Sequence, residues 1–370
     1  MPTTFEGLGG WPGVLGRLVA GDSLSADEAE CALDQVLDGA ASDAQIAALA
    51  VALRIKGETV DEMYGLVRAI LAHAERVAID GDLLDLVGTG GDRLGSINVT
   101  TLAAFIAAGT GVRVCKHGNR AASGSVGSAD VLEALGVVAD LGPAGVARCV
   151  AEAGMGFCFA PRFHPGFRYA GPVRRQIGVP TIFNFFGPLV NPAQPRYQLV
   201  GVSDGTMAEK MAGVLGANGS RRAMVAYADD GLDELSVTSP STVVEVNGDG
   251  TDFELRSWRL DPADLGLPKA TLSDLSGGDA AFNATAIRAV LGGERGPHRD
   301  IGVLNAAAAL LVAGTAADLA SGMALASDSI DDGHAAGVLD RMVEVSRQVA
   351  LEQLDGRGDA AAGSGSLGTG

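Results

Sequence analysis

Apolar residues recur every three to four positions through the N-terminal part of the chain, a spacing that predicts amphipathic helices. Ser25–Glu28 has the sequence of a capping box at the start of one such helix, and Ser42 and Thr59 precede two more. No strand-like run separates these helices along the sequence. We therefore predict that residues 1–80 form a small helical domain.

The pattern changes after residue 80, where short apolar runs alternate with helical stretches. This alternation is typical of a parallel sheet with helices on its faces and ligands at the carboxyl ends of its strands. We predict an α/β domain with a mainly parallel central sheet over residues 81–350. The pattern leaves open whether some of its helices pack with the N-terminal domain. The runs expected to form strands are 83–87, 112–115, 157–159, 197–202 and 223–227, followed by a hairpin over 234–256, with helices over 98–108 and 128–135.

The stretch most like a membrane span, Ile301–Ala320, consists mostly of small residues and contains Asn305 and Asp318. Ala contributes too little transfer free energy to hold a span in lipid, so the stretch predicts a buried helix. Residues 351–370 are rich in Gly, Ala and Ser and predict a disordered tail, because they cannot bury a core.

The 370 residues are 47% hydrophobic and 19% charged, which suits two globular domains or one large one and excludes a collagenous or wholly disordered chain. The net charge of −18 repels phosphate, so we expect neither nucleic acid nor membrane as a partner. Residues 113–175 differ, with eight Lys or Arg against four acidic residues. This excess indicates either a pocket for a small anion or ordinary surface variation.

Four cysteines lie at positions 31, 115, 149 and 158, and no two have the CxxC spacing of a zinc site or redox dithiol. Cys115 and Cys158 lie in apolar runs, so we expect buried thiols there. The N-terminus lacks the basic and apolar regions of a secretory signal. These features predict a cytoplasmic protein in a reducing compartment.

A glycine-rich loop, Gly88–Asp92, follows the first predicted strand. It is not a dinucleotide fingerprint, which needs Gly at the position of Arg93, and it lacks the Gly-Lys-Ser/Thr of a P-loop. Its bare amides, the Asn98 N-cap and the hydroxyls of Thr100 and Thr101 suit a phosphate or diphosphate with its Mg²⁺. The alternative is that the glycines form only a tight turn.

A basic segment, Lys116–Arg120, ends the second predicted strand at the same edge of the sheet. One Lys, one Arg, hydroxyls and free amides continue through residues 121–125 toward the helix at Ser128 and predict an anion cradle. His117 by itself is more often a packed histidine than a ligand contact.

Three later segments add candidate groups. Arg174 and Arg175 follow the third predicted strand, where an Arg suits a carboxylate, although adjacent Arg residues on helices are mostly solvated. The apolar segment Phe183–Pro192 then forms either a wall around a planar ligand or part of the core. Asp229–Glu234 holds four carboxylates in six residues, which indicates a divalent cation or a solvated acidic loop.

Seven segments together resemble the anthranilate phosphoribosyltransferase family of tryptophan biosynthesis, from about residue 12 to residue 350. They are GTGGD, NVTT, KHGNRAAS, FAPRFHPGFR, VRRQIG, FNFFGPLVNP and DDGLDELS. The resemblance implies a small helical domain and a larger α/β domain of the nucleoside phosphorylase/phosphoribosyltransferase type. It implies transfer of the phosphoribosyl group of 5-phosphoribosyl 1-diphosphate (PRPP) to the amine of anthranilate, with two Mg²⁺ ions, in a homodimer.

Matching the motifs residue by residue gives the site that the resemblance implies. The catalytic residues would be Lys116, Asn119 and Arg174. The anthranilate contacts would be Gly88, Asn119 and Arg174, and the metal ligands Thr100, Asp233 and Glu234. The PRPP contacts would be Gly88, Gly91, Asp92, Ser96, Asn98, Val99, Thr100, Thr101, Lys116, His117, Gly118, Asn119, Arg120, Ala121, Ala122, Ser123, Gly124 and Ser128.

The chain departs from the family pattern at two places on the phosphate side. Thr100 stands where the family usually has Ser, which keeps the hydroxyl and adds a methyl group beside the metal. Ser123–Gly127 replaces a Ser-Ser-Lys/Arg-Ser-Gly type of sequence, so a basic group near position 125 is missing. We expect this loss to weaken the affinity for PRPP.

Three other functions are weighed against this one. A pyrimidine nucleoside phosphorylase shares the domain arrangement but needs neither the Asp233/Glu234 pair nor a carboxylate site at Arg174. A nucleic-acid-binding relative should have a basic surface, which a net charge of −18 opposes. A related transferase with another aromatic amine stays open, because a few pocket contacts decide specificity. The motifs also leave open a second anthranilate site near His164.

Overall fold

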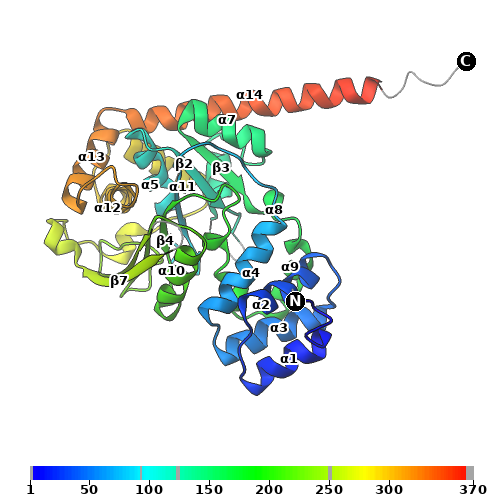
Figure 1. Ribbon diagram of the computed structural model, residues 1–370. Coiled ribbons are helices and arrows are strands. Elements are labelled where there is room, and N and C mark those ends of the chain that lie inside the picture. Colours follow the sequence, from blue (N-terminus) through cyan, green and yellow to red (C-terminus); the bar gives the residue numbers. More distant parts are fainter. Residues whose placement is uncertain (1–2, 92–93, 122–125, 249–251, 364–370) are drawn as a thin grey trace, which may run out of the picture.

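The computed structural model describes residues 3–91, 94–121, 126–248 and 252–363, and side chains as far as residue 354. It has two parts, a helical bundle that holds the N-terminus and a larger α/β body (Figure 1). The predicted fold class, a small helical domain with a larger α/β domain and a mainly parallel sheet, is confirmed. The bundle contains α1 (Gly10–Ala20), α2 (Ala26–Leu37), α3 (Asp43–Lys56) and α4 (Val60–Ala72).

Capping boxes start three of the four bundle helices. At α2, α3 and α4 the N-cap hydroxyl of Ser25, Ser42 or Thr59 accepts the N–H three residues later, and that residue's side chain accepts the N-cap N–H. The sequence pattern indicated only these three helices. Helix α1 was missed because its segment is glycine-rich and its N-cap, Gly9, offers no side-chain hydrogen bond.

Seven strands of the described chain form one sheet in the order β3-β2-β1-β4-β5-β6-β7, with β1 to β5 parallel and the last two antiparallel. The sheet grows from β1 out to β3 and then continues on the other side of β1 with β4. This reversal places a topological switch point between β1 and β4, where such sheets bind ligands. The strands are β1 (Leu84–Gly88), β2 (Val114–Gly118), β3 (Met155–Phe159), β4 (Tyr197–Gly201), β5 (Arg222–Ala228), β6 (Ser241–Gly248) and β7 (Phe253–Leu260).

The hairpin predicted over 234–256 lies later in the chain, over β6 and β7. The residues before it form a loop in which the Asp230 carboxylate accepts hydrogen bonds from the hydroxyls of Ser236 and Thr238. These side-chain hydrogen bonds satisfy the polar groups of the loop, so it needs no pairing with a strand. The alternation of apolar and polar residues does not reveal such bonds, and the predicted hairpin therefore began too early.

The sheet separates two apolar cores. Leu86 belongs to one core and Val87 to the other, as the two-residue period of a strand requires. The Leu86 core is covered by helices from the middle and the end of the chain, and the Val87 core by α10 and the bundle.

The helices of the body are α5 (Val99–Gly109), α6 (Ser128–Ala134), α7 (Pro143–Ala153), α8 (Ala160–Phe163), α9 (Phe167–Ile177), α10 (Ala208–Ala217), α11 (Ala280–Leu291), α12 (Pro297–Val312), α13 (Leu319–Asp331) and α14 (His334–Gly363). The 3-10 turns are η1 (Ile182–Asn184), η2 (Gly187–Leu189), η3 (Gly205–Met207), η4 (Pro262–Leu265) and η5 (Leu272–Leu275).

Helix α12 is buried almost throughout, so the prediction of a buried small-residue helix is confirmed as far as Val312. Within the described ranges, no helix combines the length and the apolar character that crossing a bilayer requires. The thiols of Cys115 and Cys158 are buried as expected, with their Sγ atoms 3.6 Å apart.

The last helix, α14, extends past α7 and away from the body (Figure 1). Its backbone is helical through Gly363, which differs from the disordered tail expected from residue 351. The sequence holds three consecutive alanines at 360–362, and Ala favours the extension of a helix that has already formed. Residues 364–370 lie outside the described part of the chain.

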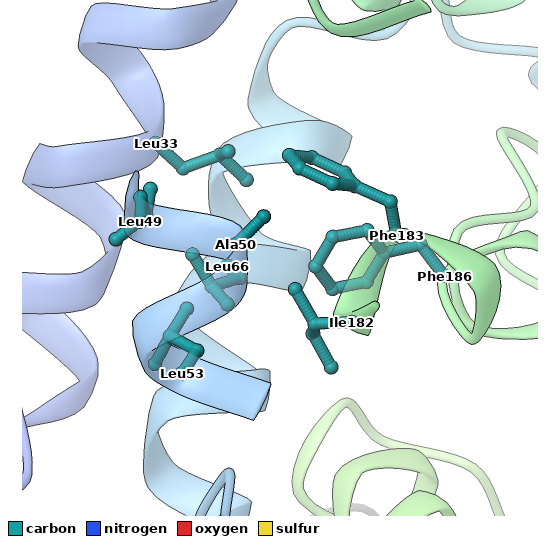
Figure 2. Close-up of a pocket in the computed structure, with 8 residues that line it drawn as sticks. All are labelled: Leu33, Leu49, Ala50, Leu53, Leu66, Ile182, Phe183 and Phe186. Atoms are coloured by element: carbon teal, nitrogen blue, oxygen red, sulfur yellow. The ribbon is translucent and has the colours of Figure 1, made fainter. Parts of the chain in front are cut away.

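An apolar contact joins the bundle to the body. Ile182, Phe183 and Phe186 of the body face leucine side chains and Ala50 of α2, α3 and α4 (Figure 2). Helix α9 packs on the bundle beside them, through Ala170 and Val173. The sequence left open whether segment 183–192 is a ligand wall or core; Phe183 and Phe186 are buried and belong to the core.

We expect Gly65→Ala to lower the free energy of unfolding by about 1–3 kcal/mol, because the backbones of α2 and α4 must separate to admit a methyl group. A Cβ at Gly65 would lie 1.9 Å from the carbonyl oxygen of Ala26. Urea unfolding measures the change. Gly16→Ala is the control, since no atom lies within 4 Å of its added Cβ. A Gly65→Ala midpoint at or above wild type would contradict the close helix packing.

Candidate active site

The acidic loop that contains Asp233 and Glu234 lies across the carboxyl ends of β1 and β4. Gly88 ends β1 and Gly201 ends β4. A Cβ on Gly201 would lie 1.4 Å from the carbonyl oxygen of Asp233, and one on Gly88 would lie 2.6 Å from Asp233 Oδ2. Glycine at both strand ends therefore lets this loop cover the switch point.

The acidic loop is tied to the glycine-rich loop after β1. Asp233 Oδ2 accepts hydrogen bonds from the N–H of Gly90 at 2.5 Å and from the hydroxyl of Thr89 at 3.2 Å. Gly90 has a φ of 69°, in the left-handed region that favours glycine. Gly91 is exposed, and Asp92 lies outside the described residues. One carboxylate thus joins two loops that the sequence analysis treated separately.

Asn98 stands at the N-cap of α5, but its side chain makes no capping hydrogen bond. Its Nδ2 donates to the carbonyl of Val126 at 2.8 Å, and its Oδ1 accepts from Nδ2 of Asn283 at 3.0 Å. The predicted N-cap position of Asn98 is therefore confirmed, although its side chain does not cap the helix. The Asn98 side chain instead links the start of α5 to α11 and to the segment before α6.

The first turn of α5 is formed by Val99, Thr100 and Thr101. Ser96 lies just before it, in an isolated β-bridge with Ser276. A helix N-terminus presents unpaired N–H groups and the positive end of the helix dipole. This turn therefore suits an anion, as the sequence pattern predicted.

Lys116 of β2 is only 1% exposed and ends at the same turn. Its ammonium donates to the carbonyl oxygen of Leu86 and to Thr100 Oγ1, the latter at 3.1 Å. Burial lowers the pKa of Lys116 to about 8, while nearby carboxylates, chiefly that of Asp85, act to raise it. The structure thus holds a cation between β1 and the N-terminus of α5.

Asp85, on β1, is a buried partner that the sequence analysis did not single out. One of its carboxylate oxygens accepts the N–H of His117 at 3.1 Å, and the other accepts Nδ2 of Asn191 at 2.9 Å. Burial raises the pKa of Asp85 to about 6, and Lys116 opposes that rise. An acidic residue inside the apolar run 83–87 was the available signal, because a buried carboxylate needs partners.

His117 and His164 form a buried pair on the side of the site toward the bundle. Their ring centroids lie 5.2 Å apart with an interplanar angle of 73°. His117 Nδ1 donates to the carbonyl of Gly187 at 2.9 Å. Burial lowers the pKa of His117 to about 4 and that of His164 to about 3. Both rings are uncharged at neutral pH, so His117 adds no positive charge to the anion cradle.

An aromatic cluster continues from His164 toward the bundle. Phe167 makes edge contacts with His164 and Phe183, each at a centroid distance of 6.2 Å. The Arg174 guanidinium of α9 lies over Phe183, with Cζ 5.9 Å from the ring centroid. Burial lowers the pKa of Arg174, although a guanidinium stays charged at neutral pH. An Arg beside aromatic rings suits an aromatic carboxylate.

The side chain of Arg120, which the sequence placed in the anion cradle, is paired with acidic residues. Its guanidinium donates to both carboxylate oxygens of Glu133 at 2.6 Å and to Asp130 at 3.2 Å. Its contribution to the anion cradle stays a prediction, and in this structure the side chain is held by two carboxylates of α6. Asn119 is exposed, and its Oδ1 accepts the N–H of Arg120 at 2.7 Å.

The rest of the cradle lies between β2 and α6. Gly118 ends β2, and a Cβ there would lie 2.1 Å from the hydroxyl oxygen of Ser128. The N–H of Ala121 donates to the Asp130 carboxylate at 3.1 Å. The predicted contacts Ala122, Ser123 and Gly124 lie outside the described residues.

The donors of the acidic loop fit a magnesium ion. Asp233, Glu234 and the Thr100 hydroxyl offer only oxygen atoms, which hard cations prefer. Both carboxylates act on the pKa of Lys116, whose ammonium contacts Thr100. No group of three or more His, Cys, Asp or Glu in the described chain could hold a metal. Since Mg²⁺ is usually held by one or two carboxylates together with substrate phosphates, two carboxylates suffice.

Two family models match the two parts of the fold. The model of the glycosyl transferase family helical bundle domain matches residues 12–74, and that of its a/b domain matches residues 80–336. The anthranilate phosphoribosyltransferase of Salinispora arenicola is 52% identical over 92% of this chain and 97% of that protein. The chain belongs to the anthranilate phosphoribosyltransferase family. The enzyme of that name from Rhodococcus jostii is 49% identical over 93% of this chain and 95% of its own.

Solved structures show the same architecture. The anthranilate phosphoribosyltransferase of Thermus thermophilus is 39% identical and matches with a TM-score of 0.84 over 90% of this chain and 99% of that chain. The Saccharomyces cerevisiae enzyme, solved in complex with PRPP and Mg, matches at 24% identity with a TM-score of 0.81 over 91% of this chain and 98% of its own. The second likeness supports the fold alone.

We expect His164→Asn to reduce the loss of stability between pH 7 and pH 5. In wild type, the pKa of His164 is about 3 when folded, against an ordinary value near 6.5 when unfolded. The unfolded chain therefore binds the proton first as the pH falls, which costs the native state on the order of 2 kcal/mol at pH 5. Urea unfolding at both pH values measures the difference.

Asp85 changes stability in the opposite direction, because its raised pKa makes the folded state bind the proton first as the pH falls. Wild type and His164→Asn both contain Asp85, so the difference between these two proteins isolates the effect of His164. Equal losses of stability for wild type and His164→Asn would show that His164 is not held neutral.

Proposed function

We propose that the protein transfers the phosphoribosyl group of PRPP to the amine of anthranilate, giving N-(5-phosphoribosyl)anthranilate and diphosphate. The observation that carries the proposal is the site at the switch point, where a buried ammonium, a helix N-terminus and two carboxylates meet beside an aromatic wall with an Arg. Relatives named for this activity are about half identical over nine-tenths of the chain.

The phosphate side would bind PRPP through the loops that meet at the switch point. Its members lie at the ends of β1 and β2, in the segments that follow these strands, and in the first turns of α5 and α6. We assign to it Gly88, Gly91, Asp92, Ser96, Asn98, Val99, Thr100, Thr101, Lys116, His117, Gly118, Asn119, Arg120, Ala121, Ala122, Ser123, Gly124 and Ser128, with His117 as a neutral contact.

We propose that the site holds two Mg²⁺ ions. Their ligands from the protein would be the carboxylates of Asp233 and Glu234 and the hydroxyl of Thr100. When bound, Mg²⁺ neutralises negative charge on the diphosphate. The choice of metal rests on the oxygen-only donors of these three residues and on the family resemblance. The number of ions rests on the family resemblance.

Lys116 would stabilise the leaving diphosphate. Departure of diphosphate from C1 leaves an oxocarbenium-like ribose, so the main requirement is to stabilise negative charge on the leaving group. A buried ammonium does this more strongly than an exposed one, because water screens it less. The aryl amine is mostly neutral at pH 7 and attacks without a strong general base.

Arg174 would pair with the carboxylate of anthranilate, with Gly88 and Asn119 as further contacts. Phe183, a core residue, lies under the guanidinium and supports it. His164, which is neutral at pH 7, adds no charge to this side of the site. A planar anion with one carboxylate matches this combination.

A homodimer and a cytoplasmic location are part of the proposal. Val19 at the end of α1 and Ile55 at the end of α3 are 79% and 82% exposed, and these two helices pack on each other. Two such side chains do not define an interface, so the proposed homodimer rests on the family resemblance. Sedimentation velocity measures the oligomeric state.

We expect Arg174→Ala to raise the KM for anthranilate about 10- to 100-fold and to leave the KM for PRPP nearly unchanged, because it removes a charge-assisted pair with the carboxylate. Loss of anthranilate fluorescence with PRPP and Mg²⁺ measures both constants. Arg175→Ala is the matched control, since Arg175 is the next residue on α9 and is exposed.

If wild type binds PRPP without consuming anthranilate, the acceptor is another amine. Phosphorolysis of a pyrimidine nucleoside by wild type would contradict the proposal directly.

We expect Lys116→Met to lower kcat about 100- to 1000-fold, because the leaving diphosphate loses its buried cation. Met keeps the length and the apolar stem of the side chain. The KM for anthranilate should change little, since the Lys116 ammonium contacts Leu86 and Thr100 on the phosphate side. A kcat within threefold of wild type would show that Lys116 has no such role.

A further inference from the structure

Asn305 is a polar residue in the middle of α12, within the Ala-rich stretch that the sequence analysis compared with a membrane span. It is 1% exposed. Its Oδ1 accepts the N–H of Leu235 at 3.1 Å, and its Nδ2 donates to the carbonyl of Leu235 at 2.9 Å and to that of Ile301 at 2.9 Å. The side-chain amide therefore binds both backbone groups of one residue, as a neighbouring strand would.

Leu235 follows directly after Glu234 in the acidic loop. It is buried and lies outside the strands, so its N–H and carbonyl need partners that the sheet does not supply. In the described chain those partners come from Asn305. A hydrocarbon side chain at position 305 would fill the space but leave both backbone groups of Leu235 without a hydrogen bond.

The acidic loop is held from the other side by close packing. The carbonyl of Asp233 lies where a Cβ of Gly201 would be, at 1.4 Å, and so rests directly on the end of β4. Leu232 and Leu235 are anchored in the core on the Leu86 side of the sheet. Asn305 completes this support with directional bonds, which fix the orientation of the peptide next to Glu234.

We propose that Asn305 is a positioning residue for the metal ligands. By binding Leu235 it sets the backbone of the acidic loop so that Asp233 and Glu234 meet the metal and diphosphate together. This inference rests on the proposed function, since it concerns the carboxylates assigned there. It predicts that loss of the Asn305 amide weakens metal binding specifically and not only the stability of the fold.

The test compares Asn305→Leu with Ser329→Ala. Ser329→Ala is the control, because it also removes a buried hydrogen bond. The Ser329 hydroxyl of α13 donates to the carbonyl of Ile106 of α5 at 2.8 Å. Mn²⁺, used as a spectroscopic probe, is titrated into each protein with PRPP and followed by electron paramagnetic resonance. The Mg²⁺ concentration for half-maximal activity and the KM for anthranilate are measured alongside, with the unfolding midpoint as a check of the fold.

We expect Asn305→Leu to weaken Mn²⁺ binding at least tenfold and to raise the half-activating Mg²⁺ concentration by a similar factor, with the KM for anthranilate within about twofold of wild type. Ser329→Ala should change neither metal constant, although it lowers the unfolding midpoint. Unchanged Mn²⁺ binding in a folded Asn305→Leu protein would overturn the proposal and leave Asn305 with a packing role only.

If Asn305→Leu does not fold, Asn305→Ala decides. Asn305→Ala removes both bonds to Leu235 with a smaller side chain, so we expect the same change in Mn²⁺ binding; wild-type binding in the folded protein would overturn the proposal. Failure of the proposed function is recognised separately, as wild-type protein that does not convert anthranilate while the Mn²⁺ titrations with PRPP still report on Asn305.

Discussion

The buried charge of Lys116 is the constraint around which the site is built. An ammonium removed from water costs several kcal/mol unless polar groups replace its hydration. The Leu86 carbonyl and the Thr100 hydroxyl replace part of it, and Asp85 with the two carboxylates of the acidic loop supplies opposite charge. These partners come from β1, α5 and the loop after β5, so the charge can be buried only when the switch point is fully assembled.

The charged groups lie on one side of the site and the neutral rings on the other. On the phosphate side, Lys116, the start of α5 and the acidic loop suit a diphosphate with its metal. On the side toward the bundle, His117 and His164 are uncharged and continue into phenylalanines, with Arg174 as the cation. This division matches a reaction that separates an anionic leaving group from an aromatic acceptor. It also links the acceptor side to the bundle, since Phe183 contacts the bundle helices as well.

Buried asparagines support the functional segments in a similar way. Asn283 holds the Asn98 side chain, Asn191 holds the Asp85 carboxylate, and Asn305 holds the backbone beside Glu234. A side-chain amide both donates and accepts, so it can replace a strand or a helix turn where irregular backbone is buried. Each of these amides comes from an element distant in sequence, which makes the shape of the loops depend on the packed helices around them.

Signals within a few residues of one another determined much of this protein from the sequence alone. Capping residues such as Ser25 and the apolar periods located the bundle helices and the parallel strands, and the family motifs placed Lys116 at the end of β2. The tertiary structure decided which partners the polar side chains have within the fold. Arg120 is paired with Glu133, Asn98 is used by Asn283, and the buried carboxylate in β1 has partners far along the chain. Burial and hydrogen-bond partners depend on contacts between distant segments, and a local pattern does not contain those contacts.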